Sequence, residues 1–363
     1  MSAKTMIKRV ASARRDCKHP PVSSNNQEET MTRAQRAARR WALAFAMMAS
    51  SVSASAQTLQ PVSVIVFPGG FNWPIWVAQE KGYFARGGIE VKLTPTPNSV
   101  FQLTNLIEGK FDIGMTAFDN VVAYMEGQGE APVSVQPDLM VFMGSDHGFL
   151  SLTAVPEVKS AAELKGKTVS VDAATTGYAF VLFDLLKKNG LASGDYTVEK
   201  AGGVVQRWQA LREKKHAATM LITPFDVMAK GAGFNVLQYA IDVYGNYQGL
   251  VGATRRGWAA ENAPKLQSYI SAYVAGIEWL RDQKNKDEAI AILRKNLQQM
   301  SPELAEQSHA VLAGPKGFAP KAQFDAAGAR KVLELRSEYG QPKKSLTDPL
   351  RYYDAKYYQA AMR

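Results

Sequence analysis

The chain has 363 residues, which favours two domains, and its 43 Lys and Arg against 33 Asp and Glu give a formal net charge of +10. Residues 1–56 contain ten of the basic residues and three of the acidic ones, which leaves 33 basic and 30 acidic residues in the remainder. Because that remainder is almost neutral and has no run of Lys or Arg, the sequence argues against binding to nucleic acid or another polyanion.

The N-terminal leader, residues 1–56, has the order of a signal peptide. A basic region with four Arg precedes a short apolar stretch, residues 41–49, and an A-x-A cleavage site that ends at Ala56. The pattern predicts cleavage after Ala56 and translation from Met31. The apolar stretch is too short to cross a bilayer, so we expect it to direct export and not to anchor the protein.

The single cysteine, Cys17, lies in this leader. The mature chain is therefore expected to have no disulfide, no cysteine nucleophile and no cysteine for a lipid anchor. No later apolar stretch reaches the ~18 residues of a membrane span. Together these features predict a soluble, exported protein that is not a lipoprotein.

The first unit of the mature chain reads as strand, turn, helix and strand. Val64 to Phe67 is apolar and β-branched, as expected of a strand buried on both faces. Pro68-Gly69-Gly70 ends this strand, and Pro74 can begin a helix because a proline in the first turn loses no hydrogen bond. Gly82 can end the helix before a strand at 89–93. Such a βαβ unit places ligands beyond the carboxyl ends of its strands.

Strands and helices continue to alternate along the chain. We expect helices at 98–109, 121–126, 159–165, 178–188, 204–214 and from Thr223-Pro224, strands at 111–115, 139–144, 149–155, 168–171, 196–199, 218–222, 234–240 and 250–255, and a helical region from Ala263. The predicted fold class is α/β with two lobes, each a mostly parallel sheet flanked by helices, and a helical C-terminal extension.

A four-residue motif that occurs in two loops supports the prediction of two similar lobes. Thr116 to Asp119 and Thr223 to Asp226 both read Thr-x-Phe-Asp, and each follows a predicted strand. We expect lobe I to comprise residues 57–147 and 249–363, lobe II residues 148–248, and the hinges to lie near 144–148 and 244–249.

Three motifs in order resemble a known family. Trp73-Pro74-x-Trp76-x-Ala78-x-Glu80-x-Gly82-Tyr83-Phe84 resembles the first βαβ unit of the periplasmic substrate-binding proteins of ABC importers, in the nitrate, sulfonate and taurine class. This class includes relatives that bind a thiamine pyrimidine precursor. Leu106-x-x-Gly109-x-Phe111-Asp112 and Leu164-Lys165-Gly166-Lys167 resemble its next signatures, whereas residues 211–217 depart from its pattern. The resemblance implies a type II periplasmic binding fold, hinge closure on a ligand, and delivery by a monomer to a membrane permease and its ATPase.

Loops that follow strands present free backbone N–H groups and helix N-termini to a cleft. On this ground we expect ligand contacts from Phe71, Asn72, Trp73, Asn98, Ser99, Phe118, Asp119, Asp172, Thr175, Thr176, Tyr178, Thr223, Phe225 and Tyr247. Capping alone is the alternative for Asn98, Ser99, Asp119 and Thr175, and hinge packing for Tyr247. Arg207 is interpreted as a solvated helix residue, with a role as partner of an anion as the alternative.

The residue types in these loops bear on the ligand. Aromatic walls with carboxylates favour a planar, nitrogen-bearing aromatic or heterocyclic ligand, with nitrate, a sulfonate or a taurine-type anion as the alternative. The sequence disfavours an enzyme on the same fold, similar to the yeast-type thiamine pyrimidine synthase. That enzyme depends on a cysteine-rich motif, whereas the predicted mature chain has no cysteine. His147, His216 and His309 have no metal-binding spacing, so neither a metal nor a cofactor is expected.

Overall fold

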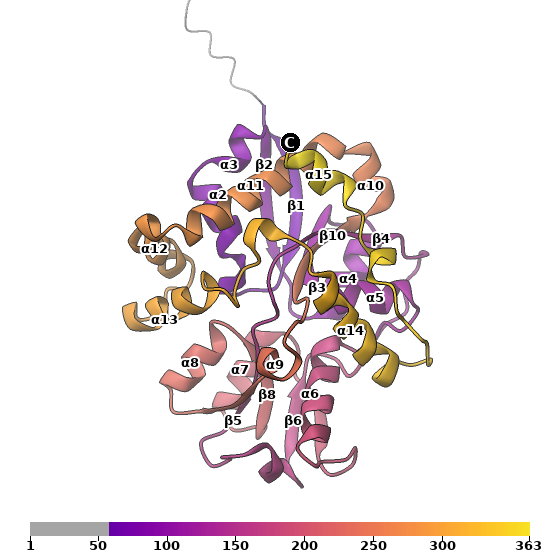
Figure 1. Cartoon of the computed structure of the whole chain (residues 1–363), viewed down its shortest axis with the longest axis vertical. Coiled ribbons are helices and arrows are strands. Elements are labelled where there is room, and N and C mark those ends of the chain that lie inside the picture. The colour runs from indigo at the N-terminus through magenta and orange to yellow at the C-terminus, as the bar shows by residue number, and fades with distance from the viewer. Residues whose placement is uncertain (1–57) are drawn as a thin grey trace, which may run out of the picture. The chain divides into compact units, whose positions relative to one another are not determined.

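The computed structural model describes residues 58–363 (Figure 1). The predicted signal peptide, with its start at Met31 and its cleavage after Ala56, lies outside the described residues, as does Cys17. Within the described part of the chain, no helix has both the length and the apolar character needed to cross a bilayer.

The first sheet has the strand order β2-β1-β3-β10-β4. Its strands are β1 (Gln60–Val66), β2 (Ile89–Pro95), β3 (Ile113–Ala117), β4 (Leu139–Gly144) and β10 (Leu250–Arg255). β3 and β4 are buried along their whole length, which is why their sequences are almost entirely apolar. β1 pairs in parallel with β2 and β3, whereas β10 runs antiparallel to β3 and β4.

The second sheet repeats this plan in the order β7-β6-β8-β5-β9. Its strands are β5 (Leu150–Ala154), β6 (Thr168–Val171), β7 (Thr197–Lys200), β8 (Ala218–Ile222) and β9 (Asn235–Tyr239). β6 is parallel to β7 and β8, and β5 is antiparallel to β8 and β9. The single reversed strand of each sheet, β10 or β5, is the one that the chain forms as it arrives from the other sheet.

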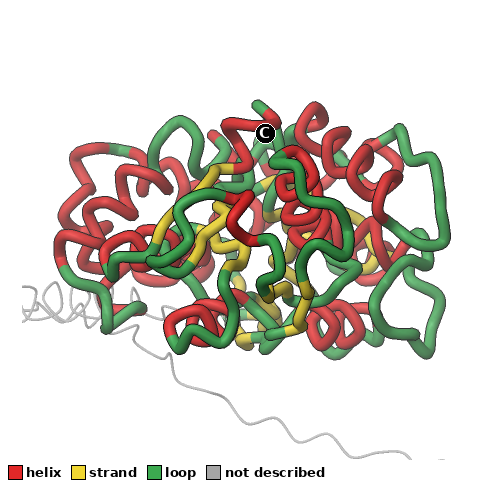
Figure 2. Tube along the Cα trace, turned by 90° about the horizontal axis from the view of Figure 1, so that it is seen from below, coloured by secondary structure: helices red, strands yellow, loops and turns green. Residues whose placement is uncertain are grey.

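Helices flank both sheets (Figure 2). The first lobe, built on the first sheet, has α2 (Trp73–Glu80), α3 (Tyr83–Arg86), α4 (Ser99–Ile107) and α5 (Phe118–Met125). The second lobe, built on the second sheet, has α6 (Gly177–Lys188), α7 (Val204–Arg212), α8 (Phe225–Gly231) and α9 (Ala240–Tyr244). The C-terminal extension is helical, as predicted, with α10 (Arg256–Glu261), α11 (Ala263–Arg281), α12 (Lys286–Asn296), α13 (Pro302–Leu312), α14 (Ala326–Tyr339) and α15 (Lys356–Ala361).

The extension touches both lobes. α14 packs against α5 of the first lobe and against α6 of the second lobe (Figure 1). α13 likewise packs against α8 of the second lobe. The two lobes are therefore joined by C-terminal helices in addition to the two segments that cross between the sheets.

Two strand-to-helix junctions differ from the sequence-based expectation. The predicted loop at 116–120 is absent, because β3 continues to Ala117 and α5 begins at Phe118 without an intervening turn. Thr223 was expected to cap the following helix, but Pro224 is the N-cap of α8 and no side chain caps it. Thr223 and Pro224 are joined by a cis peptide bond.

The two crossing segments, 145–149 and 240–249, lie side by side. The Gly249 N–H donates to the Asp146 carbonyl over 3.3 Å. A Cβ at Gly249 would lie 2.0 Å from Asp146 Oδ1 and 2.7 Å from the Gly148 nitrogen, so only glycine allows this approach. The chain crosses between the lobes at a closely packed point with no space for a side chain.

Candidate functional site

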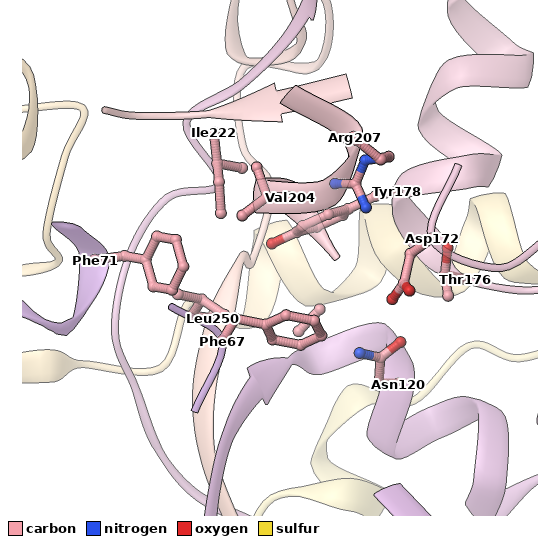
Figure 3. Close-up of a pocket in the computed structure, with 11 residues that line it drawn as sticks. Phe67, Phe71, Asn120, Asp172, Thr176, Tyr178, Val204, Arg207, Ile222 and Leu250 are labelled. Atoms are coloured by element: carbon pink, nitrogen blue, oxygen red, sulfur yellow. The ribbon is translucent and has the colours of Figure 1, made fainter. Parts of the chain in front are cut away.

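A pocket lies between the two lobes, beyond the carboxyl ends of four strands (Figure 3). Phe67 follows β1, Ala117 ends β3, Asp172 follows β6 and Ile222 ends β8. This is where an α/β sheet places its ligands, because loops and helix N-termini converge there. The remaining lining residues are Phe71, Asn120, Thr176, Tyr178, Val204, Arg207 and Leu250.

The pocket is narrow. Its cavity volume is about 30 Å³. The walls from the two lobes therefore lie close together.

The pocket has an apolar end and a polar end (Figure 3). Phe71, Val204, Ile222 and Leu250 gather at the apolar end, and the Phe67 ring lies between the two ends. Arg207, Asp172, Thr176 and Asn120 gather at the polar end. Such a division orients a ligand with one polar and one apolar portion.

Arg207 is the cation of the polar end, and it is only 4% exposed. Its Nη1 donates to the Gly202 carbonyl over 2.7 Å, and its Nη2 and Nε donate to the Met220 carbonyl over 3.2 and 3.4 Å. Burial lowers the pKa of Arg207 from its ordinary value, while attraction to Asp172 and Tyr178 opposes that shift. A guanidinium stays charged under such conditions.

Three further polar groups line the same end. Asp172 accepts the Ser99 N–H on Oδ2 over 2.9 Å, and its buried Oδ1 has no partner among the described residues. Asn120 donates from Nδ2 to Thr116 Oγ1 over 3.0 Å, which fixes the amide and leaves its oxygen as an acceptor. Burial raises the pKa of the Tyr178 hydroxyl well above its ordinary value, so this hydroxyl is neutral.

Direct contacts hold the two lobes together around the pocket. The Gly203 N–H of the second lobe donates to the Pro97 carbonyl of the first over 2.9 Å. Thr175 Oγ1 donates to Glu130 Oε2 over 2.9 Å, and the same carboxylate pairs with Lys200. With the bond from Ser99 to Asp172, these contacts join the rims of the two lobes in a closed arrangement.

Among residues 58–363, no three His, Cys, Asp or Glu side chains come together as a metal site requires.

A protein-family model described as NMT1/THI5 like matches residues 72–286, more than half of the chain. The chain belongs to the NMT1/THI5-like family. The family resemblance predicted from the motifs is confirmed. No curated protein matches the sequence at a significant level.

Several solved structures have a fold similar to that of this NMT1/THI5-like chain, at low sequence identity. The alkanesulfonate-binding protein SsuA from Xanthomonas axonopodis pv. citri, bound to MOPS, is 16% identical, with a TM-score of 0.61 over 77% of this chain and 91% of that one. The periplasmic nitrate-binding protein NrtA from Synechocystis PCC 6803 is 14% identical, with a TM-score of 0.61 over 73% of each chain. A ligand-binding component of an ABC-type import system from Staphylococcus aureus, with zinc bound, is 12% identical, with a TM-score of 0.66 over 83% of this chain and 99% of that one. The predicted two-lobed periplasmic binding fold is confirmed.

Four of the predicted site residues line the pocket of this NMT1/THI5-like protein: Phe71, Asp172, Thr176 and Tyr178. Asp172 comes directly after β6, Phe71 lies in the turn between β1 and α2, and Thr176 and Tyr178 lie at the N-terminus of α6, which follows β6. Thr176 also caps α6, accepting the Ala179 N–H on its side-chain oxygen.

Trp73 and Phe118 belong to the hydrophobic core and not to the pocket lining. Trp73 has no exposed surface; its Nε1 donates to the Ala289 carbonyl over 3.0 Å and its ring packs edge-on to His309. Phe118 packs edge-on to Phe324 and Tyr352. The structure thus places Trp73 away from the pocket in which a ligand contact was predicted, because its ring packs against the C-terminal helices.

Asp119 and Thr175 are occupied by an arginine from the C-terminal extension. Arg336 and Asp119 form a two-bond ion pair in which neither side chain is more than 1% exposed. Arg336 Nη2 also donates to the Thr175 carbonyl over 2.6 Å. Neither residue lines the pocket, because both complete a contact between the lobes.

Ser99, Asn98 and Asn72 serve the backbone. Ser99 bonds Asp172 through its backbone N–H and not through its side chain. Asn98 caps α4 by accepting the Phe101 N–H over 2.8 Å. The Asn72 amide donates to the Phe67 carbonyl over 2.6 Å, within the turn after β1. The Asn98 and Asn72 side chains thus hold the backbone of loops near the pocket, and none of the three residues lines it.

Thr223, Phe225 and Tyr247 are also absent from the pocket lining. Thr223 is fully buried, and the Phe225 ring lies beside Gly69. The Tyr247 ring lies against Gly148 in the crossing segments, which is the hinge-packing alternative.

The sequence-based list lacks seven lining residues: Phe67, Ala117, Asn120, Val204, Arg207, Ile222 and Leu250. Ala117 and Ile222 are the last residues of their strands and Phe67 directly follows β1, so their positions at strand ends are the signal that could have identified them. Arg207 was interpreted as solvated, and that interpretation is wrong because the carbonyl groups of Gly202 and Met220 hold it inside the second lobe.

Proposed function

We propose that this chain is a periplasmic solute-binding protein of an ABC importer, which captures a small organic ligand between its two lobes and delivers it to the permease and ATPase. The observation that carries the proposal is the pocket between the lobes, which contains a buried Arg207 and lies where the strand ends of both sheets meet. The membership in the NMT1/THI5-like family and the names of its structural neighbours support the same function.

The ligand that we propose is planar and aromatic or heterocyclic. Phe67, Phe71 and Tyr178 offer ring faces, and Asp172 offers a carboxylate to ligand N–H groups. Buried Arg207 also favours a second candidate, a nitrate, sulfonate or taurine-type anion, because a guanidinium binds such groups through paired hydrogen bonds.

Closure of the lobes is the proposed mechanism of capture, with residues 144–148 and 244–249 as the hinges. A ligand held by one lobe shifts the open–closed equilibrium only if the other lobe also touches it. Both lobes contribute to the pocket, through Asn120 and Phe67 on one side and Arg207 and Asp172 on the other. The permease would then distinguish the closed protein from the open one.

A thermal-shift screen of organic acids, sulfonates and heterocycles tests the proposed function, because a ligand that binds only the native state raises its melting temperature. In small-angle X-ray scattering, the protein saturated with the strongest compound should have the radius of gyration of the closed structure. If the protein without ligand is open, this value is lower than the value measured before the compound is added. The function is rejected if no compound in such a library stabilises the protein.

Replacing Gly203 with Val should keep the protein folded but disfavour the closed state. A Cβ at Gly203 would lie 2.9 Å from the Pro97 carbonyl oxygen of the other lobe. The backbone φ of Gly203 is −61°, so the substitution strains no dihedral. We expect a larger radius of gyration without ligand, and an affinity for the screened compound that is lower by about tenfold, or ~1.4 kcal/mol.

Gly257→Val is the matched control, because a Cβ at Gly257 meets no atom within 4 Å. It should leave the radius of gyration and the affinity unchanged. Equal behaviour of the two variants would show that the contact between Gly203 and Pro97 has no part in closure.

A further inference from the structure

We propose that the ligand carries a compact zwitterionic head, an anionic group beside an N–H donor group as in an α-amino acid, on an aromatic or apolar body. This inference rests on the proposed binding function and names the ligand class of the same pocket. Arg207 would bind the anionic group, Asp172 would bind the N–H group, and the rings of Phe67 and Phe71 would cover the body.

Arg207 has N–H groups that make no hydrogen bond to the described residues. A guanidinium carries five N–H groups, and three of them are used by the Gly202 and Met220 carbonyl groups. One N–H on each terminal nitrogen is left without a partner among the described residues. A buried charged donor without a partner is unfavourable, so an acceptor in the pocket stabilises this arrangement.

Asp172 has a hydrogen-bond acceptor without a donor. Its Oδ2 accepts the Ser99 N–H, whereas its Oδ1 is buried and accepts nothing from the described part of the chain. Arg207 and Asp172 lie at the same end of the pocket, yet no hydrogen bond joins them (Figure 3). The second lobe therefore presents a cation and an anion at the same end of the pocket, each with hydrogen-bonding capacity that the described residues leave unused.

A ligand with a single charge satisfies only one of these groups. A plain anion on Arg207 would lie close to the partly buried Asp172 carboxylate and be repelled by it, and a plain cation would be repelled by Arg207. A head that carries both charges satisfies both residues at once. The apolar end, with Val204, Ile222 and Leu250, gives the rest of the ligand an uncharged environment.

Isothermal titration with three compounds of one skeleton tests the inference: phenylglycine, which is the zwitterion, phenylacetate, which lacks the amine, and benzylamine, which lacks the carboxylate. Alanine, propionate and ethylamine form the same series without the ring. We expect phenylglycine to bind at least about 30-fold more tightly than phenylacetate or benzylamine, as for a buried charge pair that loses one partner. The zwitterion should also be preferred in the series without the ring.

Asp172→Asn separates specificity from damage to the fold. The variant keeps the shape of the side chain and an acceptor for the Ser99 N–H. Phenylglycine should fall to the affinity of phenylacetate, while phenylacetate should bind as well as before or better, because the repulsive carboxylate is gone. A merely structural defect would weaken both compounds together. Asp287→Asn, which removes an exposed carboxylate on α12, should change neither affinity.

Two results overturn the inference and leave the proposed function standing: phenylacetate that binds as tightly as phenylglycine with no effect of Asp172→Asn, or a strongest compound in the broad screen that carries only one charge. If neither the six probes nor the broad screen gives any binding, the proposed function fails together with the inference.

Discussion

Replacing Arg336 with Met should lower the free energy of unfolding by about 3–5 kcal/mol, because it leaves a buried carboxylate without its partner. Arg336 has no exposed surface, and Asp119 is 1% exposed. The guanidinium donates to Asp119 Oδ1 over 2.6 Å and to Gln128 Oε1 over 3.2 Å. A methionine of similar length fills the space but replaces none of these bonds.

The same substitution should loosen the contact between the lobes. Arg336 lies on α14, and its Nη2 bonds the Thr175 carbonyl while its guanidinium lies 4.8 Å from the Phe180 ring centre. Thr175 and Phe180 belong to the second lobe, whereas Asp119 belongs to the first. We therefore expect the radius of gyration of Arg336→Met to exceed that of the unchanged protein without ligand, in addition to the loss of stability in urea.

Two controls define the cause. Arg330→Met removes an exposed arginine from the same helix and should change the free energy of unfolding by less than about 0.5 kcal/mol. The double variant Arg336→Met with Asp119→Leu removes both charges and should recover most of the lost stability, because the penalty comes from the unpaired carboxylate. A double variant as unstable as the single one would locate the penalty elsewhere.

The fold follows from local sequence patterns to a large extent. The predicted strands at 139–144, 168–171 and 218–222 have the bounds of β4, β6 and β8, because each is rich in apolar or β-branched residues and stops at a glycine or directly before a polar residue. The order of strands within each sheet could not be predicted from these runs. It depends on which β-strand pairs form after the chain crosses between the lobes.

The site could be predicted only where it is local. Asp172, Thr176 and Phe71 follow strands, and a position next to a strand end is visible in the sequence. The predictions failed where a residue's position depends on a partner far away in the sequence. The partner of Trp73, Ala289, lies 216 residues further along, and Arg336 lies 217 residues beyond Asp119. A single sequence carries no signal for such pairs.

Asp146→Asn should stabilise the protein at neutral pH, and the gain should vanish as the pH falls. Asp146 lies in the first crossing segment, is 1% exposed, and accepts the Gly148 N–H over 2.8 Å and the Leu250 N–H over 3.1 Å on Oδ1. Its Oδ2 has no partner among the described residues. Burial raises the pKa of this carboxyl from 3.8 to about 7 despite the two N–H bonds.

The direction of the pH dependence follows from that shift. Between pH 4 and pH 7 the unfolded chain has released the Asp146 proton while the folded protein retains it, so the free energy of unfolding falls as the pH rises. A shift of about three units corresponds to as much as ~4 kcal/mol at pH 7 and above. Asparagine resembles the neutral acid, keeps an oxygen for the N–H groups of Gly148 and Leu250, and does not titrate.

Urea unfolding of both proteins from pH 4.5 to pH 8 measures the effect as a difference, in which other titrating groups cancel. The stability of Asp146→Asn relative to the unchanged protein should rise steadily to pH 7 and then level off. Asp287→Asn, at an exposed position, should give a difference that does not grow with pH. A flat difference for Asp146→Asn would mean that this carboxyl is already ionised in the folded protein near pH 5, and that the two crossing segments tolerate a buried charge where they meet.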